Sequence, residues 1–138
     1  LMKLTAPKQR QGEYFENLAK LYLEAQGLIF VVKNWHYKNL GELDLVMLDN
    51  KNPNTPSTLV FIEVRQRKIS HFGSSLDSIT PSKQRKIFQA TQAFLQAHPQ
   101  FDACDIRFDV VSFDANNPKT DRGVPIPNWI TNAFYPVE

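Results

Sequence analysis

The apolar residues near the N-terminus recur at the spacing of a helix. In residues 10–27 they form one stripe, polar residues fill the opposite side, and Gly27 is a natural C-terminal stop. Glu16 falls at the edge of the apolar stripe, where an exposed ion pair with Lys20, one turn later, is the ordinary explanation for a glutamate. The pattern predicts a first helix that packs against a core along one side.

Residues 80–98 predict a second helix. Thr80 is a suitable N-cap, and Pro81 stands at the first helical position, where a missing backbone N–H is tolerated. Lys83 lies four residues before Ile87 and therefore on the apolar stripe of this helix. We expect the Lys83 side chain to point inward at the start of the helix.

Four runs rich in apolar residues predict strands: 28–37, 41–48, 59–68 and 104–113. The resulting order of elements, α-β-β-β-α-β, predicts an α/β fold with a mixed β-sheet flanked by helices. We expect a flexible N-terminus over residues 1–10, one domain over 11–114, and a tail over 115–138 that packs on the same domain. Within the tail, residues 128–135 predict a short helix.

Two acidic residues interrupt the apolar pattern of neighbouring strands. Asp44 lies within the run GELDLVML, and Glu63 lies within the run LVFIEVRQRK. If these strands form a hairpin that pairs Leu48 with Leu59, the same register places Asp44 opposite Glu63, with Cβ atoms roughly 5 Å apart. Burying an unpaired carboxylate costs several kcal/mol or raises its pKa, so two facing carboxylates on central strands require a cation.

Two such carboxylates can hold a hard divalent cation, Mg²⁺ or Mn²⁺, that also binds waters and phosphate oxygens. The backbone carbonyl oxygen of Val64 is a further candidate ligand. Arg65 lies two residues after Glu63 and on the same side of the strand, where it can hold the phosphate or the attacking water. The alternative is a set of structural salt bridges, Glu63 with Arg65 or Lys83, and Asp44 with a neighbour.

The net charge of +2 is unevenly distributed. Residues 65 to 86 contain one acidic residue, Asp77, and six cations: Arg65, Arg67, Lys68, Lys83, Arg85 and Lys86. This concentration indicates a side of the molecule that faces a polyanion, although scattered surface lysines would give the same count. The last five cations are the candidate nucleic-acid-binding residues. All of these except Lys83 are expected to contact phosphate loosely or to remain solvated.

Several function classes are disfavoured by the composition. A single cysteine, Cys104, excludes an internal disulfide and a zinc site built from several cysteines, and a reducing, cytoplasmic setting is the simplest expectation. No apolar run approaches the ~18 residues that span a membrane. The first ten residues, LMKLTAPKQR, lack the apolar segment of a secretory signal. The three histidines show no metal-ligand spacing: His36, His71 and His98.

Other polar and aromatic residues have simpler interpretations. Asp109 is expected to pair with Arg107 or to cap local structure. Trp35 and Trp129 are expected to pack in the core or to form a lid rather than to stack on bases. The loop 71–75, with its glycine, is either a mobile loop over a substrate or an ordinary surface loop.

Six segments stand in a characteristic order: GEYFENLAKLYLEAQG, GELDLVMLD, LVFIEVRQR, TPSKQRKI, IRFDVVSF and the terminal NAF. Together they resemble the bacterial YraN family over residues 11–135. That family belongs to the PD-(D/E)xK nuclease superfamily and looks related to archaeal Holliday-junction resolvases. The resemblance implies a restriction-endonuclease-like fold and a metal site built from Glu16 on the first helix, Asp44 and Glu63.

Arg65 marks one departure from the family pattern, which is Glu-x-Lys where this chain has EVR. A lysine amine can exchange a proton, whereas a guanidinium stays charged and can only hold phosphate or orient water. Three outcomes follow: water activation by the metal without a lysine, a slow enzyme, or a lost activity. Lys83 matches a position where the family also carries lysine, and we expect it to contact phosphate or partly to substitute for the missing amine.

The sequence therefore predicts a metal-dependent endonuclease that hydrolyses DNA phosphodiesters with Mg²⁺ or Mn²⁺, using Asp44, Glu63 and Arg65. The resemblance implies branched DNA as the substrate class. Duplex DNA is the alternative. A junction resolvase needs two active sites, so a homodimer is expected. Two alternatives are a non-catalytic nucleic-acid-binding module of the same fold and a scaffold protein with a structural cluster of ion pairs.

Overall fold

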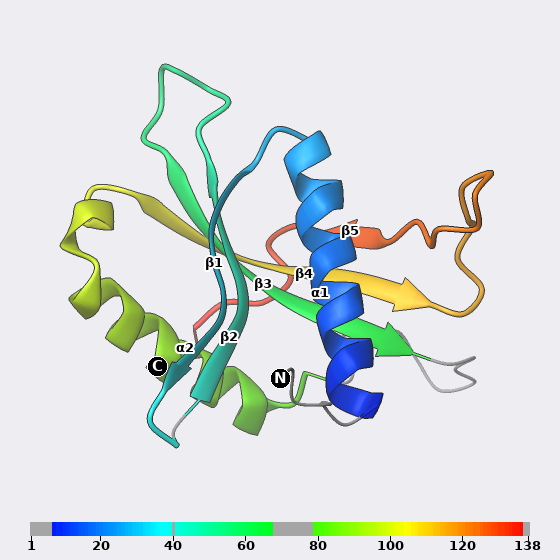
Figure 1. Cartoon of the computed structure of the whole chain (residues 1–138). Helices are drawn as coiled ribbons and strands as arrows, with labels where there is room; N and C mark the ends of the chain where they lie inside the picture. Colours follow the sequence, from blue (N-terminus) through cyan, green and yellow to red (C-terminus); the bar gives the residue numbers. More distant parts are fainter. Residues whose placement is uncertain (1–6, 40, 68–78, 137–138) are drawn as a thin grey trace, which may run out of the picture.

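The computed structural model of the protein describes residues 7–39, 41–67 and 79–136. The helices are α1 (Pro7–Ala25), α2 (Pro81–Ala97) and the short 3-10 helix η2 (Pro99–Phe101) (Figure 1). The strands are β1 (Ile29–Tyr37), β2 (Gly41–Asp49), β3 (Thr58–Arg67), β4 (Asp105–Asp114) and β5 (Asn128–Ile130). They form one sheet in the order β1-β2-β3-β4-β5, in which β3 and β4 are parallel and the other neighbours are antiparallel.

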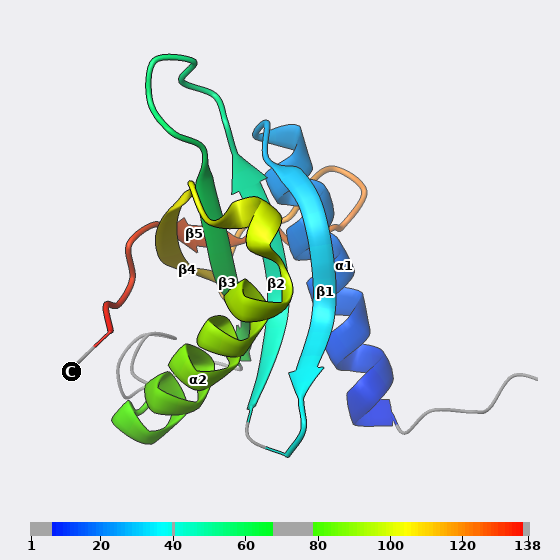
Figure 2. The same cartoon turned by 90° about the vertical axis from the view of Figure 1, so that its left-hand side faces the viewer.

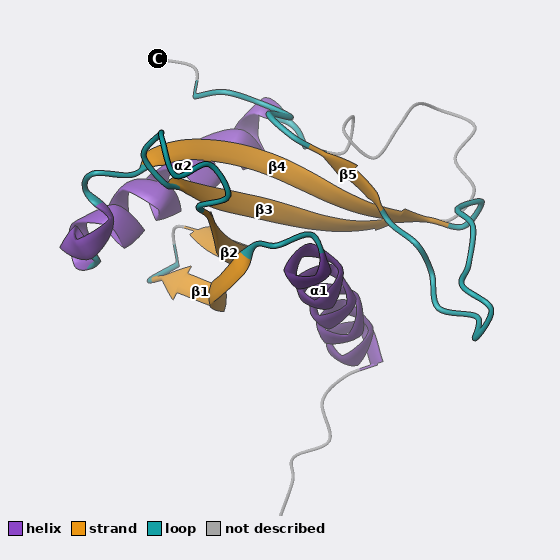
Figure 3. Cartoon of the chain, turned by 90° about the horizontal axis from the view of Figure 1, so that it is seen from above, coloured by secondary structure: helices purple, strands orange, loops and turns teal. Residues whose placement is uncertain are grey.

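Helices α1 and α2 cover opposite faces of this sheet (Figures 2 and 3). Since side chains alternate along a strand, Val60 and Ile62 of β3 join the core under α1, whereas Leu59 and Phe61 join the core under α2. Strand β3 is therefore buried on both faces, which explains its nearly continuous apolar sequence. The next position on the α2 face is Glu63.

The fold class expected from the sequence is confirmed. The chain is an α/β protein with a mixed sheet flanked by two helices, consistent with a restriction-endonuclease-like fold. The register of the β2–β3 hairpin is also as predicted, since Leu48 pairs with Leu59 and Val46 pairs with Phe61. In the part of the chain that the structure describes, neither helix has the length and apolarity needed to cross a bilayer.

The prediction of a short helix in residues 128–135 is wrong. Residues 128–130 instead form β5, which pairs with residues 110–112 of β4. Asn132 adopts a φ of 52°, in the left-handed region, and donates its backbone N–H to the Asp109 carboxylate at 3.0 Å. Because the backbone N–H groups of this segment find partners on β4, tertiary pairing overrides the local helical spacing.

Helix α1 begins earlier than expected. Its first residue is Pro7, so residues 7–10, which the sequence analysis assigned to a flexible N-terminus, are helical. Proline is favoured at the first position of a helix because its fixed φ suits that position and the missing N–H would have no partner there. The helix therefore gains one more turn than the apolar stripe alone indicated.

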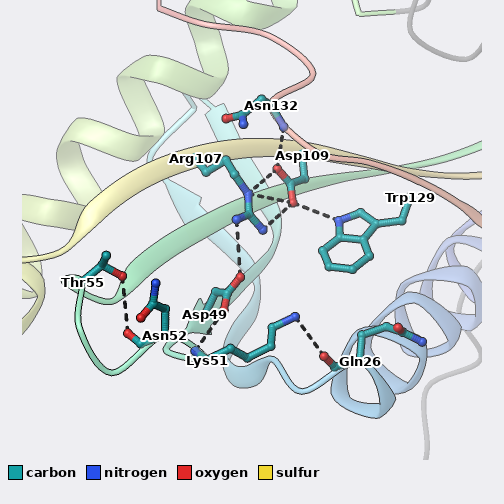
Figure 4. Close-up of polar contacts among 9 residues, drawn as sticks. All are labelled: Gln26, Asp49, Lys51, Asn52, Thr55, Arg107, Asp109, Trp129 and Asn132. Atoms are coloured by element: carbon teal, nitrogen blue, oxygen red, sulfur yellow. Dashed lines mark hydrogen bonds and ion pairs between the residues drawn. The ribbon is translucent and has the colours of Figure 1, made fainter.

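A buried carboxylate ties the tail to the sheet (Figure 4). Asp109 is fully buried and accepts hydrogen bonds from Arg107 Nε at 2.9 Å and Nη2 at 3.0 Å, as the sequence predicted. It also accepts the indole N–H of Trp129 at 2.9 Å and the backbone N–H of Asn132. Arg107 reaches Asp49 of β2 at 3.4 Å. Trp129 thus has a structural role, and the charges of Asp49, Arg107 and Asp109 are paired with one another.

Candidate active site

Strands β2 and β3 stop pairing at the candidate site. The last pair of their ladder is Leu45 with Ile62. The next opposed positions are Asp44 and Glu63, whose carboxyl groups lie close enough to interact. Here the backbone N–H of Val64 donates to Asp44 Oδ2 at 3.0 Å instead of to a backbone carbonyl. The two acidic residues therefore meet where the predicted register placed them, in the gap between the two strands.

Glu63 is buried without full compensation. Its side chain has only 4% exposure, and its Oε2 lies 3.5 Å from Arg65 Nη2 and 3.6 Å from Lys83 Nζ. Lys83 points inward, as predicted, and both ion pairs of the structural alternative are present. They are long, however, and among the described residues Glu63 Oε2 has no hydrogen bond, nor do Nε and Nη2 of Arg65. Buried polar atoms in this condition require an explanation, of which a bound ion is one.

Glu16 reaches the same region from α1. The residue is half-buried, and within the described part of the chain its Oε2 is buried without a hydrogen bond. The expected surface pair with Lys20 is not among the ion pairs of the described residues. Lys20 Nζ lies instead over the Phe30 ring, 4.4 Å from its centroid. Glu16 therefore lies near the Asp44 carboxylate rather than in a surface pair with Lys20.

The carboxyl groups of the site disturb one another's ionisation. Burial raises the pKa of Glu63 to about 8, and the Asp44 carboxylate adds to this shift. Burial also raises the pKa of Asp44, against the lowering effect of the Val64 hydrogen bond. The pKa of Glu16 rises to about 7 through burial and through the Asp44 and Glu42 carboxylates. Carboxyl groups with raised pKa values that gather in a cleft are typical of functional sites.

These donors fit a hard divalent cation such as Mg²⁺ or Mn²⁺. A strand residue directs its N–H and C=O toward the same neighbouring strand, so the Val64 carbonyl faces the strand that carries Asp44. In residues 7–39, 41–67 and 79–136, no three His, Cys, Asp or Glu side chains already stand in the arrangement of a complete metal site. An ion here would rely on Asp44, Glu63, the carbonyl and waters, which suits Mg²⁺ because that ion keeps several waters.

Two clefts open from the site and share Glu42, Asp44 and Lys83 in their lining. The larger has a volume of about 490 Å³ and lies between the ends of β1 and β2 and the first turns of α2. The smaller has a volume of about 200 Å³ and lies between α1 and β3. Glu63 lines the larger cleft, and Glu16 lines the smaller one. A ligand seated over Asp44 can therefore extend in two directions.

A family model described as "Uncharacterised protein family UPF0102" matches residues 15–113. This chain belongs to the UPF0102 family. UPF0102 proteins of Psychrobacter arcticus and Psychrobacter cryohalolentis are 51% and 43% identical to it, in each case over 96% of this chain and 84% of the relative. A UPF0102 protein of Legionella pneumophila is 40% identical over 91% of this chain and 95% of the relative. UPF0102 is the YraN family, so the resemblance that the ordered sequence segments indicated is confirmed.

In this UPF0102 chain the candidate ligands and catalytic residues all line the two clefts: Glu16, Asp44, Glu63, Val64 and Arg65. The candidate nucleic-acid-binding residues that the structure describes fall into two groups. Lys83 and Lys86 line the larger cleft, whereas Arg67 and Arg85 line neither of the two. Lys68 and the loop 71–75 lie outside the described residues. The basic cluster of the sequence therefore contributes to the site mainly through α2.

Three residues that line the clefts were not predicted from the sequence: His36, Lys38 and Glu42. Glu42 lines both clefts and lies 3.3 Å from His36 Nδ1, and Lys38 lines the larger cleft beside them. Glu42 had a signal, because it and Asp44 are the acidic positions of the otherwise apolar run 41–48. His36 and Lys38 had none, since only the packing of the β1–β2 hairpin near α2 brings them to the cleft.

Proposed function

We propose that this UPF0102 protein is a metal-dependent endonuclease that hydrolyses DNA phosphodiesters. Asp44, Glu63 and the Val64 carbonyl would hold Mg²⁺ or Mn²⁺, with Glu16 beside them. The observation that carries the proposal is the buried Oε2 of Glu63, which has no hydrogen bond among the described residues and lies near a second, half-buried carboxylate, that of Asp44. Such an arrangement is costly in the free protein and is relieved by a divalent cation.

The cation would neutralise charge on a phosphate and lower the pKa of a water, which supplies the nucleophile. Arg65 would position the phosphate. Its side chain lines the smaller cleft, and its Nε and Nη2 atoms lack hydrogen bonds in the described residues, so the planar fork could bind phosphate oxygens once the side chain turns into the cleft. Because a guanidinium does not give up its proton, Arg65 cannot act as a base.

Lys83 would supply the amine that the sequence motif lacks. Its Nζ lies 3.6 Å from Glu63 Oε2, the same oxygen that Arg65 Nη2 approaches at 3.5 Å. The Lys83 amine of α2 thus lies beside Glu63 Oε2, which a lysine at position 65 would also reach. The Lys83 side chain is 40% exposed and the Arg65 side chain 20%, so Lys83 has the better access to solvent protons. In this scheme Lys83 holds or exchanges a proton at the nucleophile.

Branched DNA is the substrate class that the family resemblance favours, and cutting both strands of a junction would require a homodimer. The proposed place of action is the cytoplasm. A second candidate function is a non-catalytic nucleic-acid-binding module. It is favoured by Arg65, which replaces the proton-exchanging lysine of the Glu-x-Lys pattern while keeping a cation for phosphate.

Cleavage of a labelled four-way junction and of a matching linear duplex, with Mg²⁺ and with Mn²⁺, tests the proposal. The informative variant is Asp44→Asn, whose amide oxygen can still accept the Val64 N–H. Asp121→Asn, at an exposed position outside both clefts, is the matched control. We expect metal-dependent cutting by the wild type and the control and none by Asp44→Asn. Binding without cutting would support the second candidate, and equal cutting by Asp44→Asn would remove Asp44 from the site.

A further inference from the structure

The β1–β2 hairpin packs directly on helix α2. A Cβ atom at Gly41 would lie 2.6 Å from the backbone oxygen of Lys86 and 3.4 Å from Ala90 Cβ. Only glycine allows this approach without displacing one of the two elements. Gly41 and Lys86 both line the larger cleft, so the cleft is bounded where hairpin and helix meet. Its width is therefore set by contact with a backbone rather than by flexible side chains.

The basic side chains of the larger cleft differ in what they contact. Lys83 lies beside Glu63, and His36 lies beside Glu42. Lys38 and Lys86 also line the cleft, and in the described residues neither lies within ion-pair distance of a carboxylate. One of these lysines comes from the hairpin and the other from the helix. A ligand between the two elements would thus meet, from each, one cation without a carboxylate partner, although Lys38 Nζ lies over the Tyr37 ring, 5.3 Å from its centroid.

The first turn of α2 adds neutral donors to the same cleft. The Thr80 hydroxyl accepts the backbone N–H of Lys83 at 3.2 Å, and the Thr80 carbonyl accepts that of Gln84 at 2.9 Å. Ser82 directly precedes Lys83, in the turn where backbone N–H groups have no partner within the helix. Ser82 lines the cleft, so its N–H and hydroxyl can reach an anion there, at the positive end of the helix dipole.

We propose that the larger cleft binds the phosphate adjacent to the scissile one in a nucleic acid strand. Lys38 holds this phosphate from the hairpin, and Ser82 and Lys86 hold it from α2. The subsite rests on the proposed function, because the residues that line both clefts, Asp44 among them, connect it to the reacting phosphate. A strand is favoured over a free anion because the cleft, at about 490 Å³, is open to the site and too large for one phosphate alone.

The test measures binding of a labelled four-way junction and a labelled linear duplex over a series of salt concentrations. Lys38→Gln and Lys86→Gln are each expected to reduce the slope of log K against log salt by about 1, with the double variant reducing it by about 2. Lys119→Gln, at an exposed position outside the clefts, removes the same charge and should leave the slope unchanged. In cleavage assays the two cleft variants should raise KM and leave kcat unchanged.

The outcomes separate this subsite from the nuclease proposal. If Lys38→Gln and Lys86→Gln match Lys119→Gln while Asp44→Asn abolishes cutting, the subsite is wrong and the nuclease remains. If the two cleft variants reduce the slope although no protein cuts, the subsite is supported and the nuclease proposal fails. If the wild type binds neither DNA, the subsite is overturned together with its premise.

Discussion

Asp44 accepts a hydrogen bond from the Val64 N–H at 3.0 Å, across the point where β2 and β3 cease to pair. The bond replaces one rung of the ladder and fixes the direction of the Asp44 carboxylate before any ligand arrives. Sites whose groups are held by strands in this way are more accurately positioned than sites on loops. The chemistry that we propose for Glu63, Arg65 and Lys83 depends on this rigid reference point. Three predictions test that chemistry, and a fourth tests the packing around the larger cleft.

A lysine at position 65 should partly replace the amine of Lys83. Lys83→Gln should lower kcat about 100-fold or more, the usual effect of losing a group that transfers protons. Adding Arg65→Lys should recover part of that loss, because both side chains reach Glu63 Oε2, at 3.5 and 3.6 Å. Single-turnover cleavage by wild type, both single variants and the double variant measures this. Activity of Lys83→Gln equal to wild type would contradict the role, as would a double variant no faster than Lys83→Gln.

Stability of the metal-free protein should fall as pH rises. The pKa of Glu63 is about 8 in the folded protein against an ordinary 4.5, so between these values the folded state binds more protons than the unfolded chain. Its free energy of unfolding therefore decreases with pH across that window. Glu63→Gln should be more stable than wild type by about 2 to 4 kcal/mol at pH 8.5, since each pKa unit corresponds to about 1.4 kcal/mol. Near pH 4.5 the two should be alike.

Urea unfolding at pH 4.5, 6.5 and 8.5, with a chelator present, measures that difference. Glu24→Gln, at an exposed position of α1, is the matched control and should follow the wild type. A difference between wild type and Glu63→Gln that does not grow from pH 4.5 to 8.5 would show that the pKa of Glu63 is not raised in the folded protein. It would also remove the argument for a cation at the site.

A divalent metal ion should restore the stability that the protein loses as pH rises. Mn²⁺ or Mg²⁺ binds deprotonated carboxylates, so the increase in Tm that it produces should be larger at pH 8 than at pH 5.5. At a concentration 100 times the Kd, the stabilisation is about 2.7 kcal/mol. Asp44→Asn should show little increase at either pH, and Asp121→Asn should behave as wild type. Thermal unfolding with and without metal is the measurement, and an equal shift in Asp44→Asn would place the ion elsewhere.

Two glycine-to-alanine changes should have opposite effects. Gly41→Ala places a methyl group 2.6 Å from the Lys86 backbone oxygen, so it should destabilise the protein by about 1 to 3 kcal/mol and weaken DNA binding. Gly12→Ala lies within α1, where the new methyl would be 3.7 Å from Glu16 Oε1, an ordinary contact. It should stabilise the protein by about 0.5 to 1 kcal/mol. Denaturant unfolding compares them, and a neutral Gly41→Ala would mean that hairpin and helix separate easily.

The sequence allowed the centre of this site to be predicted because strand periodicity is a local signal. Glu63 follows Leu59 and Phe61 at every second position, so its burial could be read from the chain. The hairpin register then fixed Asp44 as its neighbour, and Lys83 was identified by its place on an apolar helical stripe. Each inference required only the spacing within one element or one hairpin.

The parts that could not be predicted depend on contacts between distant segments. The apolar spacing of residues 128–135 favours a helix, and only the edge of β4 and the Asp109 carboxylate convert it to β5. Lys38 looks like an ordinary turn residue until Gly41 is known to lie against α2. In both cases a tertiary contact decides the outcome, and local propensity carries no information about it.

The Asp109 carboxylate has a consequence for how the chain folds during synthesis. Its partners Trp129 and Asn132 lie 20 and 23 residues after it in the sequence, whereas Arg107 is available as soon as β4 is made. Until residues 128–132 emerge, a nascent chain that closed its sheet would bury a carboxylate with two donors missing, which is unfavourable. We therefore expect chains truncated before Trp129 to be less stable than the full chain and more open to proteases.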